Sequence, residues 1–156
     1  MTQAKTRFSS FEEYLAATES LPEGLYEYWD GELIPLITES GDNDQIANLL
    51  FLLLVQAGIP YRLIKPGRCE IQVIGRPRTR FPDLVLLRDE HPELLSQRNT
   101  ITRQMPPPRL VVEVLNPGKA NRDRDLIDKR QQYAEIDIPE YWLIDPDQQT
   151  ITLLQW

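Results

Sequence analysis

Residues 110–115 form a short run that is aliphatic at every position except Glu113. Such a run is typical of a strand that is covered on both faces, as in the sheets of α/β proteins. A carboxylate inside a covered strand costs free energy unless a cation or strong hydrogen-bond donors accompany it. We therefore expect Glu113 to be buried beside a cation or a strong hydrogen-bond donor.

The sequence on both sides of this run alternates between strand and helix patterns. Asp30 and Gly31 favour a tight hairpin turn between strands at 25–29 and 32–37. Helical spacing predicts a helix over 42–56, which we expect to be buried, and another over 122–136, while Ser10 caps a short helix that follows it. Further strands are predicted at 61–65, 68–74 and 83–87, with a closing hairpin at 141–144 and 150–154. This order predicts an α/β fold with one mixed β-sheet flanked by α-helices.

Asp83 holds a place similar to that of Glu113, because it opens the apolar run 84–87. Two acids on two core strands supply the oxygen ligands that magnesium prefers, and we expect them to share one divalent ion. With one cysteine, Cys69, and one histidine, His91, the chain lacks the residues for a zinc finger, a disulfide framework or a Cys–His pair. His91 lies in a polar stretch and is expected at the surface.

The net charge of −7 argues against a general nucleic-acid coat protein, but the charge is unevenly distributed. No basic residue lies between Phe8 and Tyr61, whereas residues 62–80 are basic with Glu70 as the one acid. This segment is either the solvated face of a pair of strands or an edge that faces phosphates. Its members are Arg62, Lys65, Arg68, Arg76, Arg78 and Arg80.

The length of 156 residues fits one domain with a hydrophobic core. The longest apolar run, residues 49–55, is far shorter than the ~20 residues that a membrane-spanning helix needs. The N-terminal region carries Glu12 and Glu13 where a secretory signal would be basic and then apolar, so we expect a cytoplasmic protein. The sequence closes on an apolar strand at Trp156, which suggests that the natural chain continues.

Several segments, taken in their order and spacing, resemble the Uma-type restriction endonuclease family of the PD-(D/E)XK nuclease superfamily. They span the chain from about Phe11 onward and are Tyr26-Glu27 with Asp30-Gly31-Glu32, Pro82-Asp83-Leu84, residues 111–117, the series Asp125, Lys129 and Tyr133, and residues 139–146. The resemblance implies a restriction-endonuclease-like fold and hydrolysis of phosphodiester bonds with magnesium or manganese. It also implies DNA as the expected substrate and a homodimer as the expected assembly.

The resemblance gives roles to individual residues. Asp83 and Glu113, with the Val114 carbonyl, would hold the metal. The superfamily pattern places a lysine two residues after the glutamate, where this chain has Leu115, so the role passes to Lys129 on the next helix. Lys119 is the second candidate for the same role.

Three further residues would support this site: Glu27, Asp125 and Tyr133. Two of these roles have a plainer alternative. Asp125 and Lys129 are spaced as an exposed ion pair on a helix, and Glu27 is placed as a solvent-side hairpin residue.

Two other functions stay open. Many relatives carry a histidine near Asp44, so an inactive nuclease-like fold is possible, which would act as a dimerisation or nucleic-acid-binding module. A glycosidase also uses two carboxylates, but it lines its cleft with exposed aromatic rings. The three tryptophans here lie in predicted strands, which disfavours that reading: Trp29, Trp142 and Trp156.

Overall fold

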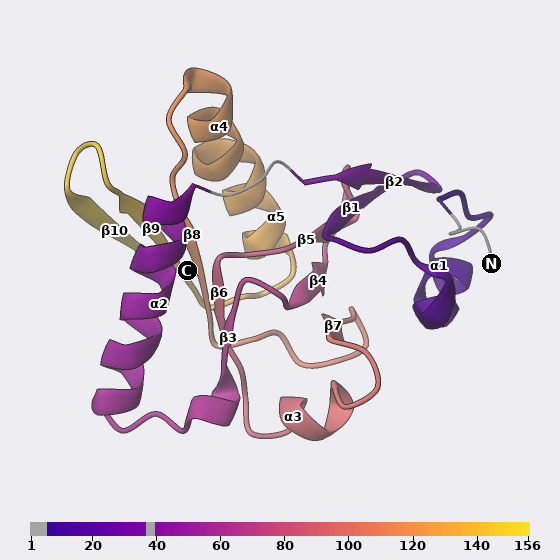
Figure 1. Ribbon diagram of the computed structural model, residues 1–156, viewed down its shortest axis with the longest axis horizontal. Coiled ribbons are helices and arrows are strands. Elements are labelled where there is room, and N and C mark those ends of the chain that lie inside the picture. The colour runs from indigo at the N-terminus through magenta and orange to yellow at the C-terminus, as the bar shows by residue number, and fades with distance from the viewer. Residues whose placement is uncertain (1–5, 37–39) are drawn as a thin grey trace.

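A computed structural model describes residues 6–36 and 40–156. Its centre is a five-stranded sheet with the order β10–β9–β8–β6–β3 (Figure 1). β8 and β9 are parallel, and the other neighbours are antiparallel. The strands are β3 (Ile64–Pro66), β6 (Leu84–Leu86), β8 (Leu110–Val114), β9 (Glu140–Asp145) and β10 (Thr150–Gln155). The predicted mixed sheet is confirmed.

Helices cover both faces of this sheet (Figure 1). α2 (Gly41–Gln56) lies on one face, where its apolar residues pack against β3, β6, β8 and β9. The other face carries a continuous helical segment of α4 (Lys119–Asp123), a π-helix over Arg124–Asp128 and α5 (Lys129–Glu135). The α/β class predicted from the sequence is therefore confirmed.

β8 lies in the middle of the sheet, and all of its residues are buried. Side chains along a strand alternate between the two faces. Val111 packs in the apolar cluster that contains Tyr133 of α5, whereas Val112 packs in the cluster beneath α2. Glu113 therefore points to the face that α5 covers.

A smaller part of the chain packs beside the main sheet. It contains a three-stranded sheet, a β-hairpin and short helices. The sheet has the order β5–β4–β7 and consists of β4 (Glu70–Gln72), β5 (Thr79–Arg80) and β7 (Thr100–Ile101). The hairpin consists of β1 (Tyr26–Trp29) and β2 (Glu32–Pro35). The short helices are α1 (Phe11–Ala16) and α3 (His91–Leu94). Short 3-10 turns lie at Thr18–Ser20 and Tyr61–Leu63.

The predicted hairpin turn is confirmed, because Asp30 and Gly31 both have positive φ angles, 28° and 93°. A side chain at Gly31 would meet the carbonyl oxygen of Phe8 at 2.6 Å, so glycine is needed there for space as well as for conformation. Ser10 caps α1 by accepting a hydrogen bond from the Glu13 N–H, as predicted. The end of the second predicted strand, at Ile37, lies outside the described residues.

Four expectations from the sequence are wrong. The described residues form sheets of five, three and two strands where one mixed sheet is predicted, and the predicted strand 61–65 begins as a 3-10 turn at Tyr61–Leu63. α2 is not buried on all sides, since Leu49, Leu52 and Leu53 are each more than half exposed. One face of the helix packs on the sheet, and nothing in the described chain covers the opposite face. His91 is fully buried and not at the surface, because its ring accepts a hydrogen bond from the Arg88 N–H and lies 2.8 Å from the Pro106 carbonyl oxygen.

Candidate active site

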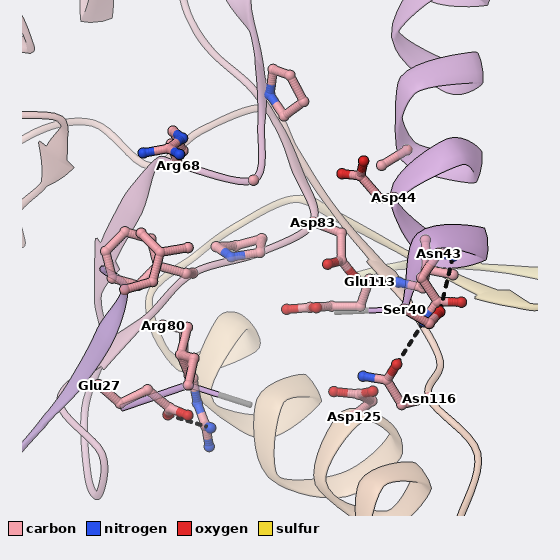
Figure 2. Close-up of a pocket in the computed structure, with 18 of the residues that line it drawn as sticks. Glu27, Ser40, Asn43, Asp44, Arg68, Arg80, Asp83, Glu113, Asn116 and Asp125 are labelled. Atoms are coloured by element: carbon pink, nitrogen blue, oxygen red, sulfur yellow. Dashed lines mark hydrogen bonds and ion pairs between the residues drawn. The ribbon is translucent and has the colours of Figure 1, made fainter. Parts of the chain in front are cut away.

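A cavity of about 810 Å³ lies where the hairpin, the first turns of α2, the β3–β4 turn and the π-helix approach the main sheet. Figure 2 shows the labelled side chains around it. Its lining carries both signs of charge, with acidic and basic groups drawn from elements far apart in the sequence. The charged residues are Glu23, Glu27, Asp44, Arg68, Arg80, Asp83, Glu113, Arg124, Asp125 and Lys129.

Asp83 and Glu113 enter this cavity from neighbouring parts of the main sheet, since Asp83 directly precedes β6 and Glu113 lies on the adjacent β8. Leu84 on β6 is paired with Val112 on β8, so the next position along the antiparallel register sets Asp83 opposite Glu113. Leu84 and Val112 both face α2, and alternation therefore turns both acids toward α5. The Val114 N–H donates to Asp83 Oδ2 at 2.6 Å, which fixes this carboxylate beside β8. Figure 2 shows both acids at the cavity.

Lys129 reaches Glu113 from the first position of α5. Its Nζ lies 3.0 Å from Glu113 Oε2 and 2.9 Å from Asp125 Oδ1. The lysine side chain is 10% exposed and the two acids are 2–3% exposed. The Asp125–Lys129 contact is thus a buried one and not an exposed helix pair. One ammonium joins a carboxylate of the sheet to a carboxylate of the helix.

Two tyrosines complete the surroundings of these charges. The Tyr133 hydroxyl donates to Glu113 Oε1 at 2.8 Å, so each oxygen of Glu113 has a partner. The Tyr141 hydroxyl donates to the backbone carbonyl of Asp125 at 2.8 Å. This carbonyl belongs to the π-helix, and a side chain inserted at a helix carbonyl is a common cause of such local irregularity.

Burial and charge act in opposite directions on Glu113 and Lys129. Burial raises the pKa of Glu113, and the neighbouring Lys129 counteracts part of this rise. Burial alone would lower the pKa of Lys129, but the charges of Glu113 and Asp125 outweigh it and the pKa is raised. Lys129 is therefore charged at neutral pH, and the ionised form of Glu113 is favoured by any further cation beside it.

The oxygen donors at the cavity suit a hard divalent cation. In the described part of the chain, no three His, Cys, Asp or Glu side chains are grouped to hold a metal ion. Magnesium, however, commonly binds through one or two carboxylates and completes its shell with water and phosphate oxygens. Asp83, Glu113 and the Val114 carbonyl offer a set of this kind, so the donor chemistry fits magnesium or manganese.

Glu27 is tied to a buried arginine. Its Oε2 lies 2.8 Å from Arg80 Nη1, and its side chain is 12% exposed, so it is not a solvent-side hairpin residue. The Arg80 side chain is 4% exposed and its Nε donates to Gln132 Oε1 at 2.8 Å. The expectation that Arg80 belongs to an exposed basic edge is therefore corrected, because its donors are used inside the protein.

The rest of the basic segment is spread over several surfaces. Arg68 is exposed and lines the cavity, whereas Arg62 and Lys65 are not among its described lining residues. Arg76 forms a surface ion pair, and Arg78 lies over an aromatic ring. The structure thus brings one exposed member of the segment, Arg68, to the candidate site.

Comparison with known proteins assigns the chain to a family. The model of the Uma2 family, described as "Putative restriction endonuclease", matches residues 11–156. The chain belongs to this family. The crystal structure of a "putative nuclease" from Anabaena variabilis is similar, with a TM-score of 0.57 and 19% sequence identity over 94% of this chain and 79% of that one. This likeness supports the restriction-endonuclease-like fold.

None of the curated proteins matches the sequence. Among the described residues, no helix combines the length and the apolar character needed to cross a membrane.

Two further candidate positions, Asp44 and Lys119, are described to different extents. Asp44 is exposed on the first turn of α2 and lines the cavity. Lys119 begins α4, but its side chain lies outside the described part of the structure. The geometry above therefore concerns Lys129 and leaves Lys119 as a candidate for mutagenesis.

Sequence reasoning missed several polar residues at this site. Gln132 is buried and contacts Arg80, and Asn43 is buried and donates to Asn116 Oδ1 at 2.7 Å. Arg124 lines the cavity from the π-helix. A signal existed for Gln132, since it follows Lys129 by three positions and so shares the inward face of the helix. The asparagine pair joins two distant segments and has no such signal.

Proposed function

We propose that the protein hydrolyses phosphodiester bonds of nucleic acid with magnesium or manganese, and that DNA is its substrate. The observation that carries this proposal is the buried contact of Lys129 with Glu113, in the same cavity as Asp83. Two strand acids with a lysine from the following helix are the groups that the family resemblance implies. Membership of a restriction endonuclease family supports the same reaction.

Each site residue has a separate role in the proposed hydrolysis. Asp83 and Glu113, with the Val114 carbonyl, would hold a divalent ion, which would polarise a phosphate oxygen and lower the pKa of a coordinated water. The Lys129 ammonium orients the attacking water or offsets the negative charge that develops on the phosphate. Asp125 and Tyr133 support this arrangement, because the first contacts the ammonium and the second donates to Glu113.

The cavity lining carries six acidic and four basic side chains, and two of the basic ones are arginines with exposed or partly exposed guanidinium groups. Arg68 is exposed on the wall formed by the β3–β4 turn, and Arg124 is partly exposed on the wall formed by the π-helix. Guanidinium groups on the cavity wall attract the phosphate backbone irrespective of base sequence. The net charge of −7 is thus compatible with a nucleic-acid substrate.

Incubation with supercoiled plasmid and with a single-stranded oligonucleotide tests this function. Each reaction is run in magnesium, in manganese and in EDTA, beside the Glu113→Gln and Asp83→Asn proteins. We expect cleavage by the wild type in metal and none in EDTA or with either variant. Cleavage that persists in EDTA, or that both variants retain, would overturn the proposal.

A second candidate function rests on the hydrogen bonding of Glu113. Both of its oxygens already have protein partners, Lys129 and Tyr133. This arrangement also suits a nuclease-like fold without catalysis that binds nucleic acid or a second copy. Magnesium titration separates the two functions, because a binding module gains no stability from the ion whereas a metal enzyme does.

We propose a symmetric homodimer for either function. β10 lies at the edge of the main sheet, and both α2 and β10 carry exposed large apolar side chains. An exposed edge strand favours pairing or packing with another chain, and two-fold symmetry is the commonest form of such assembly. In a dimer, two sites address opposite strands of a duplex.

A further inference from the structure

Arg80 connects three elements of the fold through one buried guanidinium group. It lies on β5, and its side chain is 4% exposed. Nη1 donates to Glu27 on β1, and Nε donates to Gln132 on α5, each at 2.8 Å. The hairpin, the small sheet and the helix that carries Lys129 are therefore joined by two charge-assisted hydrogen bonds, which are stronger than neutral ones.

Gln132 is bonded at both ends of its amide group. Its Oε1 accepts from Arg80 Nε, and its Nε2 donates to the carbonyls of Ile74 and Pro77 at 3.0 and 2.9 Å. These contacts hold the amide plane in one orientation, since the donor and acceptor directions cannot be exchanged. The side chain of Gln132 is thus a fixed attachment point between α5 and the loop that precedes β5.

This attachment lies beside the residues that contact Glu113. Gln132 follows Lys129 by three positions and precedes Tyr133, and both neighbours hydrogen-bond or ion-pair with Glu113. A rotation of α5 about its axis would shift all three side chains together. The Arg80–Gln132 bond opposes such a rotation, because it ties the helix to β5 in addition to the ties that Lys129 and Tyr133 make to Glu113 on β8.

We propose that Glu27, Arg80 and Gln132 form a chain of positioning residues that sets Lys129 on Glu113. Glu27 then acts through Arg80 and is not a metal ligand. Arginine is required at the centre, because a lysine could keep the ion pair with Glu27 but lacks the second, rigidly placed donor for Gln132. The effect on catalysis rests on the proposed function, whereas the effect on the Lys129–Glu113 contact does not.

The activity test uses Arg80→Lys, which keeps the charge and loses the Gln132 bond. A displacement of about 1 Å in a catalytic group can cost about 10²-fold in rate. We expect kcat for oligonucleotide cleavage to fall by about this factor while KM and the magnesium dissociation constant stay within about twofold. Arg109→Met removes an exposed arginine at a distance from the cavity and should leave all three values unchanged.

Glu27 is tested by a pair of substitutions. Glu27→Gln keeps an oxygen that accepts from Arg80, so kcat should stay within a few-fold of the wild type, whereas Glu27→Ala should lose as much as Arg80→Lys. The magnesium dissociation constant should be unchanged in both. A weakened magnesium affinity in Glu27→Gln would make Glu27 a ligand and overturn this part of the proposal.

A stability measurement keeps the inference testable if the protein does not cleave nucleic acid. The coupling free energy between Lys129 and Glu113 is obtained from a double-mutant cycle, once in the wild type and once in the Arg80→Lys background. If Arg80 sets this contact, the coupling should fall by at least about twofold in the variant background. An unchanged coupling, or an unchanged kcat in an active enzyme, would show that Arg80 only stabilises the fold.

Gln132→Met provides an independent check of the link. It removes the partner of Arg80 on α5 and should lower kcat as Arg80→Lys does. Because the two changes break the same bond, the double variant should be no slower than Gln132→Met alone. Additive losses would mean that the two residues act separately and would contradict the proposed chain.

Discussion

Replacing Lys129 with methionine should destabilise the protein, because it leaves Glu113 and Asp125 buried without the ammonium that contacts both. Methionine keeps most of the apolar length of lysine, so the loss of packing is small. Removing one partner of a buried ion pair typically costs about 3–5 kcal/mol. We expect the free energy of unfolding at pH 7 to fall by about 3 kcal/mol, the low end of this range, because Lys129 retains some exposure.

The size of this loss should depend on pH in a defined direction. Burial already raises the pKa of Glu113, and Lys129 opposes the rise, so the pKa should be higher still in the variant. A carboxyl group whose pKa is raised in the folded state does not lower the free energy of unfolding at pH values below its unfolded pKa of about 4.3. It lowers that free energy progressively as the pH rises from this value toward the folded pKa. The loss should therefore grow between pH 5 and pH 7, by at most about 1.4 kcal/mol per pH unit for one carboxyl group.

Urea unfolding at pH 5, 6 and 7 in EDTA measures this dependence. Arg130→Met is the matched control, since Arg130 is an exposed cation on the same helix and should change the stability by no more than about 0.5 kcal/mol. The double variant Lys129→Met with Glu113→Gln should recover part of the loss. A loss that is equal at pH 5 and pH 7, or no larger than that of the control, would refute the reasoning.

Three further predictions concern the metal, the lysine and the assembly. Magnesium at about 100 times its dissociation constant should stabilise the wild type by about 2.7 kcal/mol. Asp83→Asn and Glu113→Gln should abolish this stabilisation and keep the circular dichroism spectrum of the wild type. Equal stabilisation of all three proteins would contradict a shared ion. Lys129→Met should lower turnover steeply with little change in magnesium affinity, and if Lys119→Met does so instead, the lysine role moves to α4. Light scattering at micromolar concentration should give the mass of a dimer, and cleavage should break both strands; a monomer that produces nicks would contradict both expectations.

The elements that sequence analysis placed well are those in which one local signal fixes the structure. Residues 110–115 are aliphatic at every position but Glu113, which favours a covered strand, and β8 is that strand. The Asp30-Gly31 pair accepts the positive φ angles that its turn requires. α2 shows the limit of such signals, because its apolar residues surround the helix and the pattern does not state which of them a sheet will cover.

Apart from the family resemblance, the sequence predicts a site residue only where a polar side chain stands among apolar ones, so that the free-energy cost of burying it is evident. An acid among aliphatic residues must have a partner, and Glu113 has Lys129 and Tyr133. No comparable contrast marks Arg80, which stands among other basic residues and resembles a solvent-facing one. Its partners come from β1 and α5, and a contact between segments so far apart depends on the tertiary fold.

The inward face of the last helical segment changes character along its length. Within the segment it carries Asp125, Lys129 and Gln132, whose polar groups meet Glu113 and Arg80, whereas Ile136, which follows α5, packs in the apolar core. Apolar contacts tolerate small shifts because they are non-directional, but hydrogen bonds weaken steeply as their angles change. The apolar end therefore anchors the helix, and the polar bonds decide its rotation. When Gln132 or Arg80 is changed, the activation free energy of cleavage should accordingly rise by more than the free energy of unfolding falls.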